Sequence, residues 1–338
     1  MDDNIKMDDN IKSVKRCIPT DDFFYIIRID MNINGFISDF EVLDTNLLES
    51  ISYDDCIVKS ISFCHVKNRI SVLKCRIATK DLLKAYSFID NKLKPMIIKS
   101  LVLIEGITDL SIEDNIKCVI EDEEEAIKKG FPIIPYDKKY LELVVKTPNI
   151  EENKFKSAMR NFIKNNSKFD NSLFWMYVSY SIIGTSEVKN NFDYISQYRL
   201  LWTAFNSFYS KLYIGESDRK SVEAFATKKY VIEYFTKLIS SHDTYKLLKT
   251  LSCEKLILKG NNNVSEKLKQ SMEMEVKNYN EISLNGVLCL YAVRNAIIHG
   301  YAEKEVELCR TAFEVLNPLI KLSIISEINS VRQQNQSL

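Results

Sequence analysis

Hydrophobic residues change their spacing along this chain, and the change divides it into two regions. Up to residue 150, apolar and β-branched residues form short runs between polar clusters, a pattern typical of strands. The runs predict strands over 23–33, 55–66, 69–78, 99–107 and 139–147. Helical spacing from Thr79 to Pro95, and again before Gly130, predicts two short helices among them. We therefore expect an α+β domain over residues 21–150.

After residue 150 the apolar positions repeat with a period close to 3.6, as on one face of a helix. The clearest example is 192–213, where Leu201, Ala204, Phe205 and Phe208 form one stripe. Further helices are predicted over 151–166, 221–241, 244–251, 284–299 and 303–331. The pattern predicts an all-α bundle over residues 151–338.

The beginning of the chain fits neither pattern. Its first twelve residues are the hexapeptide MDDNIK written twice, and they are too polar to pack against a core. We expect a disordered tail over residues 1–20.

Composition indicates an ordinary soluble protein. The chain has 338 residues, of which 46% are hydrophobic and 27% charged, so disorder is not the general expectation. Residues 1–150 carry 21 basic and 26 acidic side chains, and the rest carry 25 and 20, which allows an anionic partner on the C-terminal half. The apolar run 173–183 is shorter than the roughly 18 residues that span a bilayer. No signal peptide is visible, and we expect a cytoplasmic protein without a membrane partner.

Eight cysteines are scattered along the chain without a CxxC pair or a regular spacing. Several lie in apolar runs, as Cys289 does in GVLCLY. This usage predicts reduced and mostly buried thiols, not a disulfide framework or a metal site.

The most unusual stretch is Arg294-Asn295-Ala296-Ile297-Ile298-His299-Gly300, at the end of the apolar run LNGVLCLYAV. Burying a guanidinium, an amide and an imidazole costs several kcal/mol, by a rough estimate, unless they find partners. Asn295 and His299 are four residues apart and share a helix face, whereas Arg294 and His299 diverge by about 140°. Gly300 predicts the helix end, where the helix dipole favours the imidazolium of His299 by roughly 0.3–1 kcal/mol.

These residue types suit RNA cleavage by the substrate's own 2′-hydroxyl. That reaction needs a base, an acid and a cation for the phosphorane charge, but neither a protein nucleophile nor a metal or other cofactor. His299 can serve as base or acid, Arg294 as a bidentate phosphate clamp, and Asn295 as an orienting donor. One copy supplies a single histidine in this stretch, so we expect a homodimer in which the motif helices of two copies face each other.

The run RNAIIH resembles the R-x4-6-H signature of the HEPN superfamily, in the form where a polar residue follows the arginine. Upstream, RLLWTAFNSFY (199–209) resembles an aromatic-rich early helix of many HEPN domains. The resemblance covers roughly residues 155–335. It implies a helical bundle that dimerises along the motif helix, and a metal-independent endoribonuclease that acts as a microbial toxin, an antiviral defence effector or an RNA-processing enzyme.

Carried over to this chain, the resemblance makes Arg294 and His299 the catalytic pair and Asn295 their polar neighbour. Asn206 stands where related domains often hold a polar residue near the site. Tyr301 completes R-x4-H-x-Y, the form found in HEPN toxins whose tyrosine is modified by a nucleotidyltransferase partner, although this chain is much longer than those toxins. The resemblance also implies an antitoxin or sensor partner. The N-terminal domain has no recognised role beyond sensing or positioning.

Two simpler interpretations stay open. HEPN-like domains also serve as non-catalytic modules for dimerisation or for binding RNA or protein. If the resemblance is accidental, His299 is a helix-capping residue and Arg294 an ion-pair partner of Glu303 or Glu305. Whether or not the resemblance holds, we expect one aromatic cluster to pack in the core, with a base-stacking surface as the second interpretation: Trp202, Phe205, Phe208 and Tyr209.

Overall fold

The computed structural model describes most of the chain between residues 25 and 335. The described segments are 25–34, 40–53, 56–67, 70–79, 82–108, 110–112, 117–120, 151–165, 167–185, 190–260, 262–298 and 305–335. The expected tail over 1–20, the short helix before Gly130 and the strand over 139–147 lie outside them.

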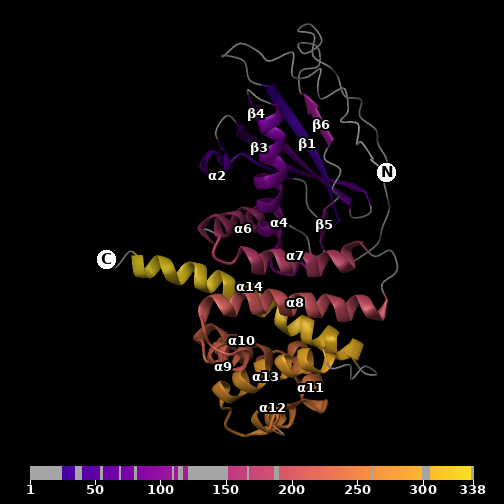
Figure 1. Ribbon diagram of the computed structural model, residues 1–338, viewed down its shortest axis with the longest axis vertical. Coiled ribbons are helices and arrows are strands. Elements are labelled where there is room, and N and C mark those ends of the chain that lie inside the picture. Colours follow the sequence, from indigo (N-terminus) through magenta and orange to yellow (C-terminus); the bar gives the residue numbers. More distant parts are fainter. Residues whose placement is uncertain are drawn as a thin grey trace, which may run out of the picture. The chain divides into compact units, whose positions relative to one another are not determined.

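Contacts divide the chain into two units. One comprises residues 1–98 and 112–160, and the other comprises 99–111 and 161–338. The first holds an antiparallel sheet with short helices, and the second is almost entirely helical, so an α+β region followed by an all-α region is confirmed at this level (Figure 1). The division differs from the expected boundary after residue 150, because 99–111 groups with the helices and 151–160 with the sheet.

The sheet of the first unit has the order β2-β3-β4-β1-β5, and β6 also pairs with β1. Its strands are β1 (Tyr25–Asn34), β2 (Phe40–Val42), β3 (Cys56–Lys67), β4 (Ile70–Thr79), β5 (Ser111–Ile112) and β6 (Lys117–Ile120). Three of them match the predicted strands over 23–33, 55–66 and 69–78. On β4, Leu73, Cys75 and Ile77 are completely buried, the period of two that places alternate side chains on one face.

The predicted strand over 99–107 is wrong. Helix α3 (Leu82–Phe88) continues through a π-helical turn (Ile89–Leu93) into helix α4 (Lys94–Val102), and turns follow. The helix therefore does not end at Pro95, which lies in the first turn of α4, where a missing N–H is tolerated. The apolar run SLVLI is buried all round, and such a run has no periodicity to separate strand from helix.

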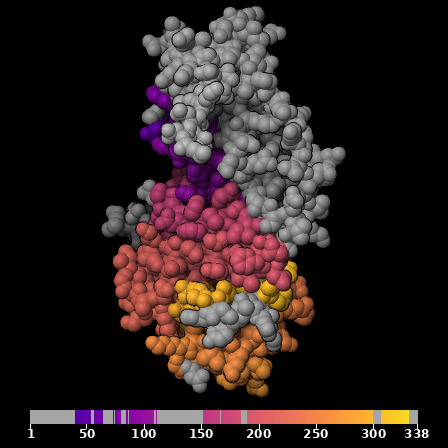
Figure 2. Space-filling view, turned by 45° about the vertical axis from the view of Figure 1, so that its right-hand side comes forward, coloured from indigo at the N-terminus to yellow at the C-terminus, as the bar shows by residue number. Residues whose placement is uncertain are grey.

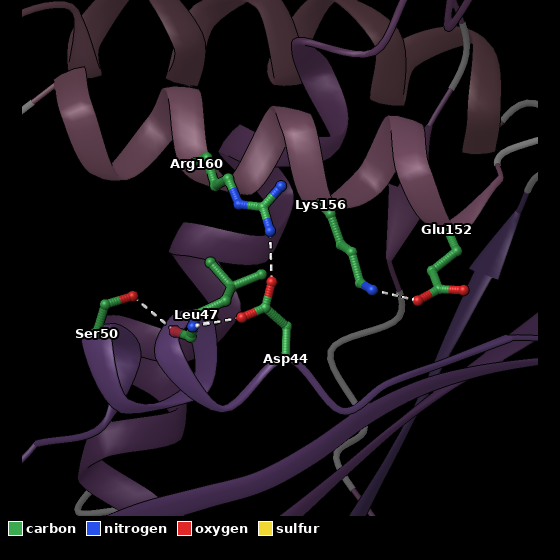
Figure 3. A network of polar contacts seen from close by, with 6 residues as sticks. All are labelled: Asp44, Leu47, Ser50, Glu152, Lys156 and Arg160. Carbon is green, nitrogen blue, oxygen red and sulfur yellow. Dashed lines mark hydrogen bonds and ion pairs between the residues drawn. The ribbon is translucent and has the colours of Figure 1, made fainter.

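Helix α2 (Thr45–Ile51) begins at a side-chain cap. The carboxylate of Asp44 accepts from the backbone N–H of Leu47 at 3.1 Å and from the guanidinium of Arg160 (Figure 3). Since Arg160 lies on helix α6 (Glu152–Asn165), one carboxylate connects two segments distant in sequence. This contact holds the first part of α6 in the first unit.

Aromatic packing attaches the same part of α6 to the sheet. The ring of Phe155 lies 4.8 Å from that of Phe63 on β3 and 5.9 Å from that of Phe40 on β2. Phe155 and Phe63 are at most 1% exposed. The helix predicted over 151–166 therefore forms as expected and covers the edge of the sheet at β2 and β3.

The second unit is a bundle of helices with one two-residue β-ladder. Its elements are α7 (Asp170–Thr185), α8 (Asn191–Leu212), α9 (Asp218–Ala226), α10 (Lys229–Ser240), α11 (His242–Cys253), β7 (Ile257–Leu258), β8 (Asn262–Asn263), α12 (Val264–Glu273), α13 (Tyr279–Ile298) and α14 (Glu305–Asn335). The single helix predicted over 221–241 is two helices, because Lys228 is extended and caps the start of α10. Helix α14 continues through Pro318.

Helix α13 is the central helix of this unit. It contacts α8, α9, α10, α12 and α14, and most of its residues between Ile282 and Val293 are buried (Figure 1). In the space-filling view, yellow residues of α14 lie between the redder residues of α7 and α8 and the orange residues of the helices before α14 (Figure 2). The aromatic residues predicted as core packing on α8 are 3% exposed or less, as Phe205 illustrates with its T-shaped contact to Phe225 at 4.9 Å.

Two expectations from composition bear on the whole chain. Of the five cysteine side chains that the structure describes, four are buried and Cys253 is exposed, which agrees with the expectation of mostly buried thiols. Helix α13, not the run 173–183, is long and apolar enough to cross a membrane by length and composition. Since 56% of its apolar window is buried inside the protein, α13 also has the character of a core helix.

Candidate functional site

The polar motif lies where α13 leaves the core. The described part of the helix extends to Ile298, which is 50% exposed, while Arg294 and Asn295 are half-buried. His299, Gly300 and Tyr301 follow directly in sequence and lie outside the described residues.

A cavity of ≈ 400 Å³ brings Arg294 together with Asn206. The two residues come from different helices, α13 and α8, and the HEPN resemblance indicated both of them. The described residues that line the cavity are Ile182, Ser196, Arg199, Leu200, Trp202, Thr203, Asn206, Arg294 and Ile298. Asn295 is not among them, but its Oδ1 accepts a 2.9 Å hydrogen bond from Nη1 of Arg294. Asn295 therefore orients the guanidinium from beside the cavity.

Buried hydrogen bonds hold α8 in place. The hydroxyl of Tyr198 on α8 donates to the carbonyl oxygen of Leu290 on α13 at 2.7 Å, one turn before Arg294. On the other side, the hydroxyl of Ser172 on α7 donates to the carbonyl oxygen of Ala204 at 2.8 Å. Such bonds have no competing water in the core, so they fix the register of the helices that form the cavity.

The charge of the cavity is positive. Arg199 and Arg294 are its only ionisable residues among the described residues that line it, and no carboxylate is present there. The described part of the chain contains no acidic partner for either guanidinium. Burial raises the pKa of the nearby Tyr198 phenol well above its ordinary value, and the charge of Arg294 opposes that shift. A half-buried positive charge without an acidic partner among the described residues favours an anionic ligand.

The side-chain amides of Asn206 and Asn295 also offer mainly hydrogen-bond donors to a ligand. The Oδ1 atom of Asn206 accepts from the hydroxyl of Ser210 at 3.2 Å, one turn further along α8. Since the Oδ1 of Asn295 is engaged by Arg294, both amides have their N–H groups left to donate. The two arginines carry donors only. The arrangement suits phosphate or carboxylate oxygens.

Arg199 was not recognised in the sequence as a site residue. A signal exists, because Ser196, Arg199, Thr203 and Asn206 recur at helical spacing on α8. They form a polar stripe beside the apolar stripe of the core. The apolar stripe predicted the helix, but nothing in the sequence placed the polar stripe next to α13.

The simpler interpretation of Arg294 as an ion-pair partner has no support in the described residues. The side chains of Glu303 and Glu305, its expected partners, lie outside them. Within the described residues, no group of three or more histidine, cysteine or acidic side chains is placed to hold a metal ion. His242 is exposed at the start of α11, away from the residues that line the cavity.

Comparisons with protein-family models, with curated proteins and with solved structures found no match for this chain.

Proposed function

We propose that this protein is a metal-independent endoribonuclease of HEPN type. The 2′-oxygen of the substrate attacks the adjacent phosphorus and loses its proton to a base, while the 5′-oxygen leaves and gains a proton from an acid. The products are a 2′,3′-cyclic phosphate and a 5′-hydroxyl. His299 acts as base or acid, Arg294 stabilises the charge of the phosphorane, and Asn295 holds the guanidinium.

The observation that carries this proposal is the shared cavity of Arg294 and Asn206. The motif alone is a short string, and short strings occur by chance. Asn206, which the same resemblance indicated as a polar residue near the site, lines the same cavity as Arg294 and supports a site there. His299 follows directly in sequence after Ile298, which lines this cavity. The absence of carboxylates from the described lining favours a phosphate group there.

A dimer supplies the second histidine in this proposal. The middle of α13 is buried in its own bundle, so two copies can meet only near its end, where Arg294, Asn295 and Ile298 are accessible. This limits the dimer contact to the last two turns of the motif helix. Roles as a toxin or antiviral effector, with an antitoxin or sensor partner, follow from the family resemblance, as does a sensing or positioning role for the first unit.

The test is cleavage of single-stranded RNA by the purified protein in EDTA. We expect cleavage with cyclic phosphate ends, and none at linkages whose 2′-hydroxyl is replaced by hydrogen. Arg294→Ala and His299→Ala should each lower the rate by at least about a hundredfold. Matched controls are Arg219→Ala on α9 and His242→Ala on α11, which remove the same side chains away from the cavity.

Two results would decide against the proposal. Equal cleavage by the protein and its His299→Ala variant excludes His299 from the chemistry. Tight binding of RNA without cleavage by the unmodified protein identifies the non-catalytic binding module instead. For the composite site, light scattering should show a dimer at micromolar concentration, and a monomer that cleaves RNA at full rate contradicts it.

A further inference from the structure

The polar stripe of α8 extends beyond the position of a single phosphate. Arg199 and Asn206 are seven residues apart, which is about 10 Å along a helix axis. Both line the cavity that holds Arg294. One phosphate group cannot contact the two ends of such a stripe, whereas successive phosphates of one strand can, because a nucleic acid carries one negative charge per nucleotide.

The side chains of the polar stripe suit contacts with the sugar–phosphate backbone of a nucleic acid. Arg199 is exposed and, among the described residues, has no acidic partner. Between Arg199 and Asn206 lies Thr203, whose hydroxyl is bonded to the Arg199 carbonyl oxygen at 3.1 Å. That bond uses the only donor proton of Thr203, which leaves the guanidinium of Arg199 and the amide of Asn206 as the donors of the stripe. Guanidinium and amide groups are usual contacts to phosphate oxygens, and such contacts carry no base information.

Among the described residues that line it, the cavity offers no open aromatic ring on which a base could stack. Trp202 lines it but is only 3% exposed, and its ring packs against Phe205 at 5.1 Å and Tyr291 at 5.7 Å. A base cannot stack on a ring whose surface is already covered. The remaining apolar lining residues are aliphatic.

We infer that Arg199, with the polar stripe of α8, binds the sugar–phosphate backbone of single-stranded RNA beside the phosphate held by Arg294. The inference rests on the proposed function, since it extends the same site to the neighbouring nucleotides. Arg199 is then a substrate-binding residue that tolerates any base. It contributes through charge, so its effect depends on salt.

Binding without cleavage tests this directly. In His299→Ala protein, the Kd for fluorescent U12 and A12 RNA is measured over a range of salt concentrations in EDTA. Each phosphate contact contributes about −0.7 to the slope of log K against log salt for single strands. We expect Arg199→Gln to make the slope less negative by about 0.7 and to weaken the binding of U12 and of A12 by the same factor. Arg199→Lys keeps the charge and should keep the slope, and Arg219→Gln on α9 should match the unsubstituted protein.

The outcomes separate this inference from the ribonuclease proposal. An unchanged slope and Kd in Arg199→Gln overturns the inference, even if the protein cleaves RNA. A loss confined to U12 or to A12 also overturns it, because it indicates base recognition. A third outcome is also possible: Arg199→Gln lowers the salt dependence of binding as expected, but the protein with His299 intact does not cleave RNA. This outcome supports the contact of Arg199 with the RNA backbone and shows that the ribonuclease proposal is wrong.

Discussion

The hydroxyl of Tyr198 on α8 donates a 2.7 Å hydrogen bond to the carbonyl oxygen of Leu290 on α13. Both groups are buried, and the bond joins the two helices that carry Asn206 and Arg294. A polar group in a core is stable there only with a partner, so this bond favours one register of α8 along α13. The geometry of the cavity follows from that register.

Removing the hydroxyl tests this relationship. Tyr198→Phe leaves the Leu290 carbonyl oxygen without this donor, and we expect the free energy of unfolding to fall by about 1–3 kcal/mol. Urea denaturation measures it, with Tyr279→Phe as a control, because Tyr279 is 39% exposed. A loss no larger than that of Tyr279→Phe means that the bond does not hold the helices in register.

Gly286 allows α10 to approach α13 closely. A Cβ atom at this position would lie 2.2 Å from Cε1 of Phe235, which is completely buried. In an exposed helix Gly→Ala stabilises by about 1 kcal/mol, but overpacking a core costs about 1–3 kcal/mol. We therefore expect Gly286→Ala to lower the Tm. The double variant Gly286→Ala/Phe235→Leu should recover part of the loss, and stabilisation by the single substitution would contradict this packing.

Lys321 makes the stability of the helical unit depend on pH. Its Nζ donates to the carbonyl oxygens of Ile104 and Ile107, both at 2.7 Å. Burial lowers the pKa of Lys321 from its ordinary 10.5 to about 7, and Glu105 opposes the shift. Between these values the unfolded chain binds more protons than the folded protein, so the stability contributed by Lys321 rises with pH and is lowest below pH 7.

Comparison with Lys321→Met isolates this effect. We expect the free energy of unfolding of the unsubstituted protein, relative to that of the Met variant, to increase from pH 7 to pH 10. Guanidinium denaturation at several pH values gives the difference. A difference that stays constant or falls over this window shows that Lys321 does not titrate there.

Asp44 caps α2 and pairs with Arg160 (Figure 3). The N–H of Leu47 holds the pKa of Asp44 below its ordinary value, and Arg160 adds to the effect. The contribution is present above the unfolded pKa and is lost as pH falls through the folded value. Asp44→Asn keeps a good cap and should change the Tm little at neutral pH, whereas Asp44→Ala should lower it. Equal losses in both variants would mean that the ion pair, not the cap, is the stabilising contact.

Local patterns were sufficient for several elements. Alternation in Leu73, Cys75 and Ile77 predicts β4, and the apolar stripe through Leu201 and Phe208 predicts α8, because these residues have one buried face. The pattern failed where burial is uniform. The run SLVLI within 99–107 is buried all round, and strand and helix then have the same sequence signature.

The sequence by itself determined which side chains are available for chemistry, and it placed Arg294 and Asn295 at the end of an apolar helix. Only the tertiary structure decided which distant residues share a cavity with Arg294. Asn206 and Arg199 lie on α8, far from the motif in sequence, and their position depends on buried bonds such as Tyr198 to Leu290. Spacing along one helix sets the face of a residue, but the register between two helices depends on how all their side chains pack together.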